Sequence, residues 1–143
     1  MPAARSHETI GRRAAFRMPM RVYWEDTDAG GIVFYANYLK FFERARTEWL
    51  RSFGHSQERL RLETGVLFVV TDTSLSYLRP ARLDDTIDVT VDIERVSYTR
   101  IAFFQQAWRG EELLTEGSIR VATVQAGTYR PRAIPNEILQ GIG

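Results

Sequence analysis

The fold is decided by the stretch NYLKFFERARTEWLRSF, which occupies residues 37–53. Large apolar side chains recur in it at steps of three or four residues, and mostly charged side chains fill the positions between them. The apolar positions are Tyr38, Phe41, Phe42, Ala45, Trp49 and Phe53. Gly54 follows directly, at the place where a helix often ends in a left-handed residue. The stretch therefore predicts an amphipathic helix with one buried face.

Downstream of this helix, up to residue 124, the sequence has the period of β-strands. Residues 66–70 (VLFVV) are apolar on both faces, which is typical of a central strand. Residues 87–94 alternate strictly between aliphatic and polar side chains, which predicts one buried face and one face in solvent. Residues 101–108 and 113–124 flank the turn Arg109-Gly110-Glu111-Glu112 and predict a hairpin. Residues 128–143 are expected to form a loop and a short terminal helix.

Upstream of the helix, residues 20–24 (MRVYW) predict a strand that follows Pro19, and residues 25–31 (EDTDAGG) predict a turn. The first fifteen residues have no periodicity and are expected to form a mobile tail. We therefore expect an α+β protein with a single domain over residues 16–143. In that domain an antiparallel β-sheet wraps around one long central helix.

Length and composition set limits on function. The 143 residues suffice for one domain, and 44% hydrophobic with 26% charged residues is an ordinary globular balance. The formal net charge is +1, so no nucleic-acid partner is expected. The absence of cysteine excludes thiol catalysis and cysteine-based zinc sites. With neither an apolar signal segment nor a stretch long enough to span a membrane, the protein is expected to be cytoplasmic.

Most sequence motifs of catalysis are missing. There is no glycine-rich nucleotide loop and no Gly-x-Ser-x-Gly nucleophile turn. His7 lies near the N-terminus, so a Ser-His-Asp triad would depend on His55 alone. Asp26-Thr27-Asp28 is similar to the start of a calcium loop, but the fifth ligand position would be Gly30 and the twelfth Asn37. A metal site is therefore not expected.

The candidate site that remains is the segment from Asp26 to Tyr38. One interpretation is structural, because carboxylates and glycines make turns and favour a helix N-terminus. The other is chemical, because Asp28, Gly30 and Gly31 stand beside a helix start whose free backbone N–H groups can polarise a carbonyl oxygen. The residues alone leave both interpretations open. Asp26 is expected to be a turn or capping residue.

The stretch DAGGIVFYANY, residues 28–38, closely resembles the signature of the 4-hydroxybenzoyl-CoA thioesterase family of hotdog-fold proteins. In that signature an aspartate is followed by a Gly-Ile-Val-aromatic-Tyr-x-Asn-Tyr run. The flanking segments RVYWEDTD (21–28) and ERARTE (43–48) are similar to the acyl-CoA thioesterase branch associated with the Tol-Pal envelope system. Two positions depart from that branch: Tyr35 stands where histidine is usual, and Trp24 stands where tyrosine is usual. Tyr35 matches the hydroxybenzoyl-CoA branch instead.

The resemblance implies a hotdog fold and hydrolysis of an acyl-CoA thioester. Asp28 would be the central carboxylate, either as a nucleophile through a mixed anhydride or as a general base on water. The backbone N–H of Tyr35 would polarise the thioester carbonyl, and Gly31 would contact the substrate. No cofactor is implied. The coenzyme A phosphates would meet basic and hydroxylic residues near the hairpin after residue 94 and near the last strand: Arg95, Ser97, Thr99, Arg100, Arg130 and Arg132.

Two other functions remain open beside this one. The chain could act on acyl carrier protein thioesters, or it could be a non-catalytic acyl-binding module on the same fold. A desolvated carboxylate at Asp28 would favour an enzyme over a binding module.

The sequence also predicts the assembly and the size of the acyl pocket. Because residues 66–70 need more cover than one helix, we expect a homodimer formed by pairing of sheet edges, and the resemblance suggests a homotetramer of two dimers. Residues 65–68 of one chain would then approach Asp28 of the other. Aromatic residues that crowd the motif predict a short pocket for short-chain or aromatic acyl groups: Trp24, Phe34, Tyr35, Tyr38 and Phe42.

Overall fold

The structure, a computed structural model, describes residues 16–142, and the predicted N-terminal tail lies outside the described residues. Its strands are β1 (Phe16–Arg21), β2 (Val66–Tyr77), β3 (Thr86–Val96), β4 (Arg100–Arg109) and β5 (Glu112–Gln125). Its helices are the short 3-10 helix η2 (Trp24–Asp26), α2 (Asn37–Ser52), α3 (Gln57–Thr64) and α4 (Asn136–Ile142). The long helix, the hairpin strands and the terminal helix are confirmed.

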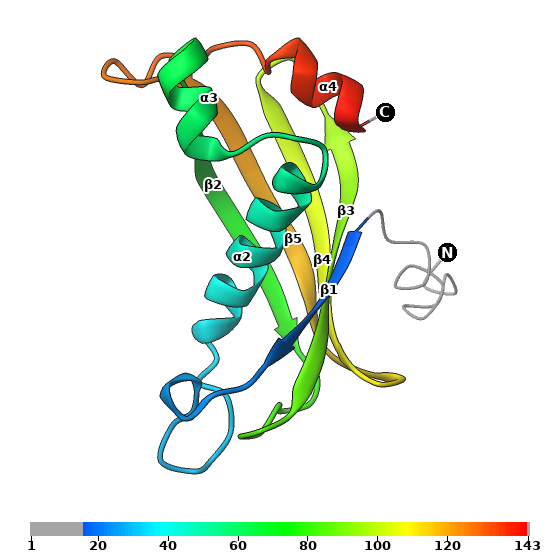
Figure 1. The fold of residues 1–143 in the computed structure, drawn as a ribbon. Helices are drawn as coiled ribbons and strands as arrows, with labels where there is room; N and C mark the ends of the chain where they lie inside the picture. Colours follow the sequence, from blue (N-terminus) through cyan, green and yellow to red (C-terminus); the bar gives the residue numbers. More distant parts are fainter. Residues whose placement is uncertain (1–15, 143) are drawn as a thin grey trace.

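The strands form one five-stranded antiparallel sheet in the order β1-β3-β4-β5-β2. The sheet is curved, and α2 runs across its inner face while α3 and α4 lie at one end (Figure 1). The loop that joins β1 to α2 lies at the opposite end. This arrangement confirms the expected α+β architecture with a sheet wrapped around one long helix.

The hydrophobic core lies between α2 and the inner face of the sheet. The predicted apolar face of the helix is buried there, including Phe41, Phe42 and Ala45. Ile87, Val89 and Val91 of β3 are fully buried, as the alternation of residues 87–94 predicts. Burial of a Phe, Ile or Val side chain contributes about 1.5–3 kcal/mol to stability. The buried residues form one hydrophobic cluster, so the described residues fold around one core.

The strand that contains residues 66–70 differs from the expectation. It was predicted to be a central strand, but within residues 16–142 β2 lies at the edge of the sheet and pairs only with β5. Val69 and Val70 are 38% and 48% exposed. A strand with two apolar faces is expected to be buried on both sides. The pattern does not show whether the residues that bury it come from the same chain or from another. A long edge with exposed aliphatic side chains is a surface on which another strand can pair.

Three other expectations were wrong in detail. The first strand spans Phe16–Arg21, so it contains Pro19 instead of following it, and residues 24–26 form η2. Helix α3 was missed because only Leu60 of its residues is buried, so it has no amphipathic period. Its ends do carry signals: the Ser56 hydroxyl accepts from the N–H of Arg59 at 3.3 Å, and Gly65 is left-handed at the other end. Thr90 on the predicted solvent face of β3 is buried.

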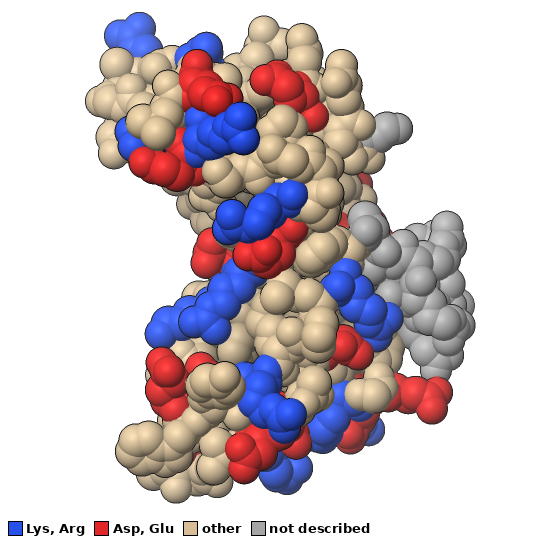
Figure 2. Space-filling view, in the orientation of Figure 1, with Lys and Arg blue, Asp and Glu red and all other residues tan. Residues whose placement is uncertain are grey.

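Charge and hydropathy agree with the composition. On the face shown in Figure 2, basic and acidic side chains are interspersed, in keeping with a net charge of +1. Within residues 16–142 there is no helix long and apolar enough to cross a membrane.

Candidate active site

The loop between β1 and α2 is fixed by Asp26. Its Oδ2 atom accepts from the backbone N–H of Tyr23 at 2.8 Å, and its carbonyl accepts from Nδ2 of Asn37 at 2.7 Å. The N–H of Phe34 donates to the same carbonyl at 3.0 Å. Asp26 is buried, and these bonds tie the loop to the first residue of α2. It is therefore a turn residue, as expected.

Asp28 lies on the outer part of this loop. Its Oδ1 atom accepts from the N–H of Gly30 at 2.8 Å, and its N–H donates to the carbonyl of Ile32 at 2.9 Å. Gly31 has a φ of +79°, a left-handed conformation that glycine adopts without strain. Together these bonds hold the carboxylate at the rim of an open hollow of about 430 Å³. The hollow is lined by Trp24, Glu25, Thr27, Asp28, Ala29, Gly31 and Leu83.

The carboxylate of Asp28 is exposed within the single chain, not desolvated as a catalytic role would favour. The loop that carries it projects beyond the end of the sheet (Figure 1), so α2 and the sheet do not cover it. Removal of water from Asp28 therefore requires a substrate or a second subunit over this hollow.

Tyr35 lies two residues before the start of α2, next to Ala36 at the N-cap. In the described part of the chain its backbone N–H has no hydrogen-bond acceptor, and Ala36 at the N-cap offers no side-chain cap. Such N–H groups at a helix N-terminus are oriented to bind an oxygen with negative character. The Tyr35 ring is 62% exposed and packs edge-on against Tyr77, with 5.9 Å between ring centroids. Tyr35 is therefore accessible to a ligand at this end of the helix.

The aromatic residues of the motif divide into two groups. Trp24 is 81% exposed, and Phe34 is also exposed. Tyr38 and Phe42, in contrast, are buried in the core, where the Tyr38 hydroxyl accepts from the N–H of Ala81 at 3.3 Å. Only the exposed rings are available to a ligand, so Tyr38 and Phe42 give no information about an acyl pocket.

The residues predicted to contact coenzyme A do not form one cluster. Arg95, Ser97 and Arg100 do line a common open hollow of about 670 Å³ at the β3–β4 hairpin. Arg120 of β5 joins them, and sequence reasoning missed it. The register of β4 with β5 would have identified it, because Arg120 pairs with Ala102 and Ala102 lies next to the β3–β4 hairpin.

The other three predicted residues have structural contacts. The carbonyl of Thr99 accepts from the N–H of Thr123 at 2.9 Å, and the carbonyl of Arg130 accepts from the N–H of Gln125 at 2.8 Å. Nη1 of Arg132 donates to the carbonyl of Thr64 at 3.0 Å and also to Gln125. These contacts join the end of β5 to its neighbours, and none of the three lines the hollow at the hairpin.

An antiparallel sheet rolled around one long helix places the protein in the class of hotdog-fold proteins, and here a loop that carries a carboxylate precedes that helix. The chain belongs to the Thioesterase superfamily, whose family pattern matches residues 30–116. This membership confirms the resemblance inferred from residues 28–38 and the reaction class of a thioester hydrolase.

The similar proteins agree with this assignment. The chain is 42% identical to the acyl-CoA thioesterase YbgC of Haemophilus influenzae, over 86% of this chain and 90% of that protein. It is 44% identical to the acyl-CoA thioester hydrolase YbgC of Escherichia coli O157:H7, over 87% and 92%. A probable thioesterase from Bartonella henselae has a similar structure, with a TM-score of 0.79 and 33% identity over 85% of this chain and 100% of that one.

Proposed function

We propose that this protein hydrolyses short-chain or aromatic acyl-CoA thioesters at Asp28. The observation that carries the proposal is the arrangement of the β1–α2 loop. It presents an exposed carboxylate, held by the N–H of Gly30 at 2.8 Å, and the free N–H of Tyr35 at the start of α2. A carboxylate and an N–H donor are the two groups that thioester hydrolysis requires.

The reaction can follow either of two courses. As a general base, Asp28 takes a proton from water while the water oxygen attacks the thioester carbonyl; the C–S bond then breaks, and the thiolate recovers the proton. As a nucleophile, Asp28 attacks the carbonyl itself, the thiolate leaves, and water hydrolyses the mixed anhydride to the free acid. In both courses the Tyr35 N–H stabilises the negative charge that develops on the carbonyl oxygen.

The coenzyme A phosphates are proposed to bind at the β3–β4 hairpin. Arg95 and Arg100 supply guanidinium groups there, Ser97 supplies a hydroxyl, and Arg120 adds a third cation. Arg100→Ala and Arg120→Ala should raise KM for an acyl-CoA more than for the same acyl group on pantetheine, which lacks the nucleotide. An equal effect on both substrates would contradict this assignment. A panel that includes acyl carrier protein thioesters tests the alternative carrier.

The active form is proposed to be a homodimer, or a tetramer of two dimers, with β2 of each chain at the interface. Two observations support it: Val69 and Val70 are exposed, and one edge of β2 has no strand beside it among the described residues. A long open edge of this kind is a surface on which another chain can pair. In this dimer residues 65–68 approach Asp28 of the partner subunit. Light scattering at micromolar concentration should give a dimer or tetramer mass, and a monomer would contradict the proposal.

The preference for short or aromatic acyl groups is proposed from the exposed rings beside the motif. Trp24, Phe34 and Tyr35 are exposed beside the motif, and large rings there should leave room for only a short apolar pocket. Each methylene group adds about 0.8 kcal/mol of binding only while the pocket has room. A profile of kcat/KM against chain length should have its maximum at short or aromatic thioesters. A steady rise to palmitoyl-CoA would contradict it.

A further inference from the structure

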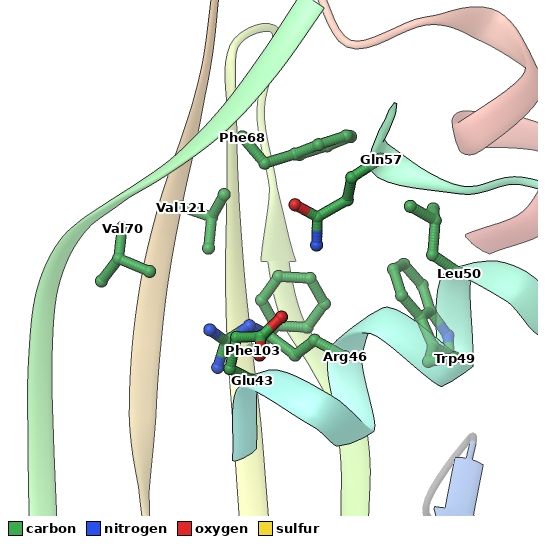
Figure 3. Close-up of a pocket in the computed structure, with 9 residues that line it drawn as sticks. All are labelled: Glu43, Arg46, Trp49, Leu50, Gln57, Phe68, Val70, Phe103 and Val121. Atoms are coloured by element: carbon green, nitrogen blue, oxygen red, sulfur yellow. The ribbon is translucent and has the colours of Figure 1, made fainter. Parts of the chain in front are cut away.

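A cavity of about 100 Å³ lies between α2, the start of α3 and the β2 side of the sheet. Figure 3 shows Trp49 and Leu50 of α2, Phe68 of β2, Phe103 of β4 and Val121 of β5 around it. These side chains are apolar or aromatic, and the polar side chains of Glu43, Arg46 and Gln57 complete the lining with Val70. The cavity shares no lining residue with the hollow at Asp28, and the proposed chemistry makes no use of it.

Arg46 is a half-buried cation in this apolar lining. Its Nη1 atom donates to Oε1 of Gln105 at 2.9 Å, and its guanidinium lies 5.9 Å from the centroid of the Phe103 ring. Burial lowers the pKa of Arg46, and the nearby carboxylate of Glu43 opposes that effect. Among residues 16–142 this guanidinium takes part in no ion pair, although it carries five N–H donors.

Gln105 fixes the position of this cation. The Gln105 side chain is fully buried, and its Nε2 atom donates to the carbonyl of Phe42 at 3.0 Å and to that of Thr90 at 3.3 Å. Because both amide hydrogens are engaged, the amide oxygen is held in one orientation toward Arg46. The chain therefore anchors one guanidinium nitrogen and leaves other donors available in a partly dehydrated space, where a hydrogen bond to an oxygen is strong.

We propose that Arg46 determines acyl specificity by donating hydrogen bonds to an oxygen atom at the far end of the acyl group. The ligand class is a short acyl chain that ends in a carboxylate or a ketone oxygen. The proposal rests on the dimer described above: Phe68 lines the cavity, and residues 65–68 approach Asp28 of the partner subunit. An acyl group whose thioester carbonyl lies at that aspartate would extend into this cavity.

Glu43 is the charge that would oppose an anionic ligand in the same cavity. Its side chain is exposed, and its Oε2 atom accepts from the Thr47 hydroxyl at 2.6 Å. Solvent therefore screens the charge of Glu43 more than that of the half-buried Arg46. The net preference of the cavity is for an acceptor oxygen, including an anionic one.

The test compares kcat/KM for pentanoyl-CoA, 4-oxopentanoyl-CoA and glutaryl-CoA, which differ mainly at the far end of the chain. The wild-type protein should favour at least one oxygen-bearing thioester over pentanoyl-CoA by about tenfold or more, the ratio that one charge-assisted hydrogen bond supports. Arg46→Met keeps an unbranched apolar side chain but has no donor, so this ratio should fall toward one. Arg44→Met, on the exposed face of α2, is the matched control and should keep the ratio.

Two results would overturn the proposal: equal kcat/KM for all three thioesters in the wild type, or an unchanged ratio in Arg46→Met. If Arg46→Met does not fold, the same kcat/KM ratio is measured for Arg46→Lys. Lys keeps the charge without the planar pair of donors, so it should reduce the ratio without abolishing it, and an unchanged ratio would again contradict the proposal. Failure of the proposed function looks different, because Asp28→Asn would then retain turnover of every thioester regardless of Arg46.

Discussion

Gly117 of β5 should not tolerate even a methyl group. A Cβ atom there would lie 2.0 Å from the carbonyl oxygen of Ser74 and 2.8 Å from Cα of Leu75, both in β2. Carbon and oxygen atoms in contact stay about 3.3 Å apart, so Gly117→Ala forces the strands to separate locally by roughly 1 Å. Because the clash is with backbone, no rotamer change relieves it. The free energy of unfolding should fall by roughly 1–3 kcal/mol, the usual range for overpacking.

The assay is thermal unfolding followed by circular dichroism, together with light scattering. At about 2–4 °C per kcal/mol, Gly117→Ala should lower Tm by roughly 2–12 °C. It should also weaken the dimer, because the strand that moves is the proposed interface. Ser76→Ala, an exposed substitution in the neighbouring strand β2, is the control and should change stability by less than about 0.5 kcal/mol. A Tm within about 1 °C of wild type for Gly117→Ala would refute the pairing of β2 with β5 described here.

Two further substitutions test the loop and its surroundings. Asp26→Ala removes the acceptor of the Tyr23 N–H, so it should lower the free energy of unfolding in urea by about 1.5–3 kcal/mol. The rate of thiol release should change much less. A large loss of rate in a protein of unchanged stability would contradict this prediction. Burial alone would raise the pKa of Asp85, but hydrogen bonds from the Arg82 N–H and from Arg109 at 2.7 Å outweigh burial and lower it. This contribution to stability is therefore present above the unfolded pKa of about 4 and is lost as pH falls through the folded value. Arg109→Met should lower the free energy of unfolding at neutral pH and reduce the loss of stability on acidification. Urea unfolding at neutral pH and at a pH below the folded pKa of Asp85 measures both effects. A loss of stability on acidification equal to that of the wild type would contradict this prediction.

The elements predicted from the sequence are those with strong periodicity. Helix α2 and the alternating strand β3 bury one face within a single chain, so their patterns report directly on the structure. Helix α3 could not be found by periodicity because it buries only Leu60, although Ser56 and Gly65 mark its ends. Cap residues are local signals, and they identify short surface helices that hydrophobic patterns miss.

The site was predicted in part. The motif residues Asp28 and Tyr35 lie on one loop because they are close in sequence, so their proximity needed no knowledge of the tertiary fold. Arg120 was missed because it joins Arg95 and Arg100 only through strand pairing. The exposure of Asp28 could not be predicted, because sequence patterns do not distinguish cover by the same chain from cover by another.

The catalytic role of Asp28 is tested most simply by measuring thiol release from short-chain and aromatic acyl-CoA by the Asp28→Asn protein. The asparagine oxygen can still accept from the N–H of Gly30, so the loop should keep its conformation while the carboxylate is lost. We expect kcat to fall by at least ~10²- to 10⁴-fold, with Tm close to that of the wild type. Asp84→Asn, at an exposed aspartate in another loop, should retain full activity. An Asp28→Asn protein that keeps most of its activity would contradict a catalytic role for Asp28.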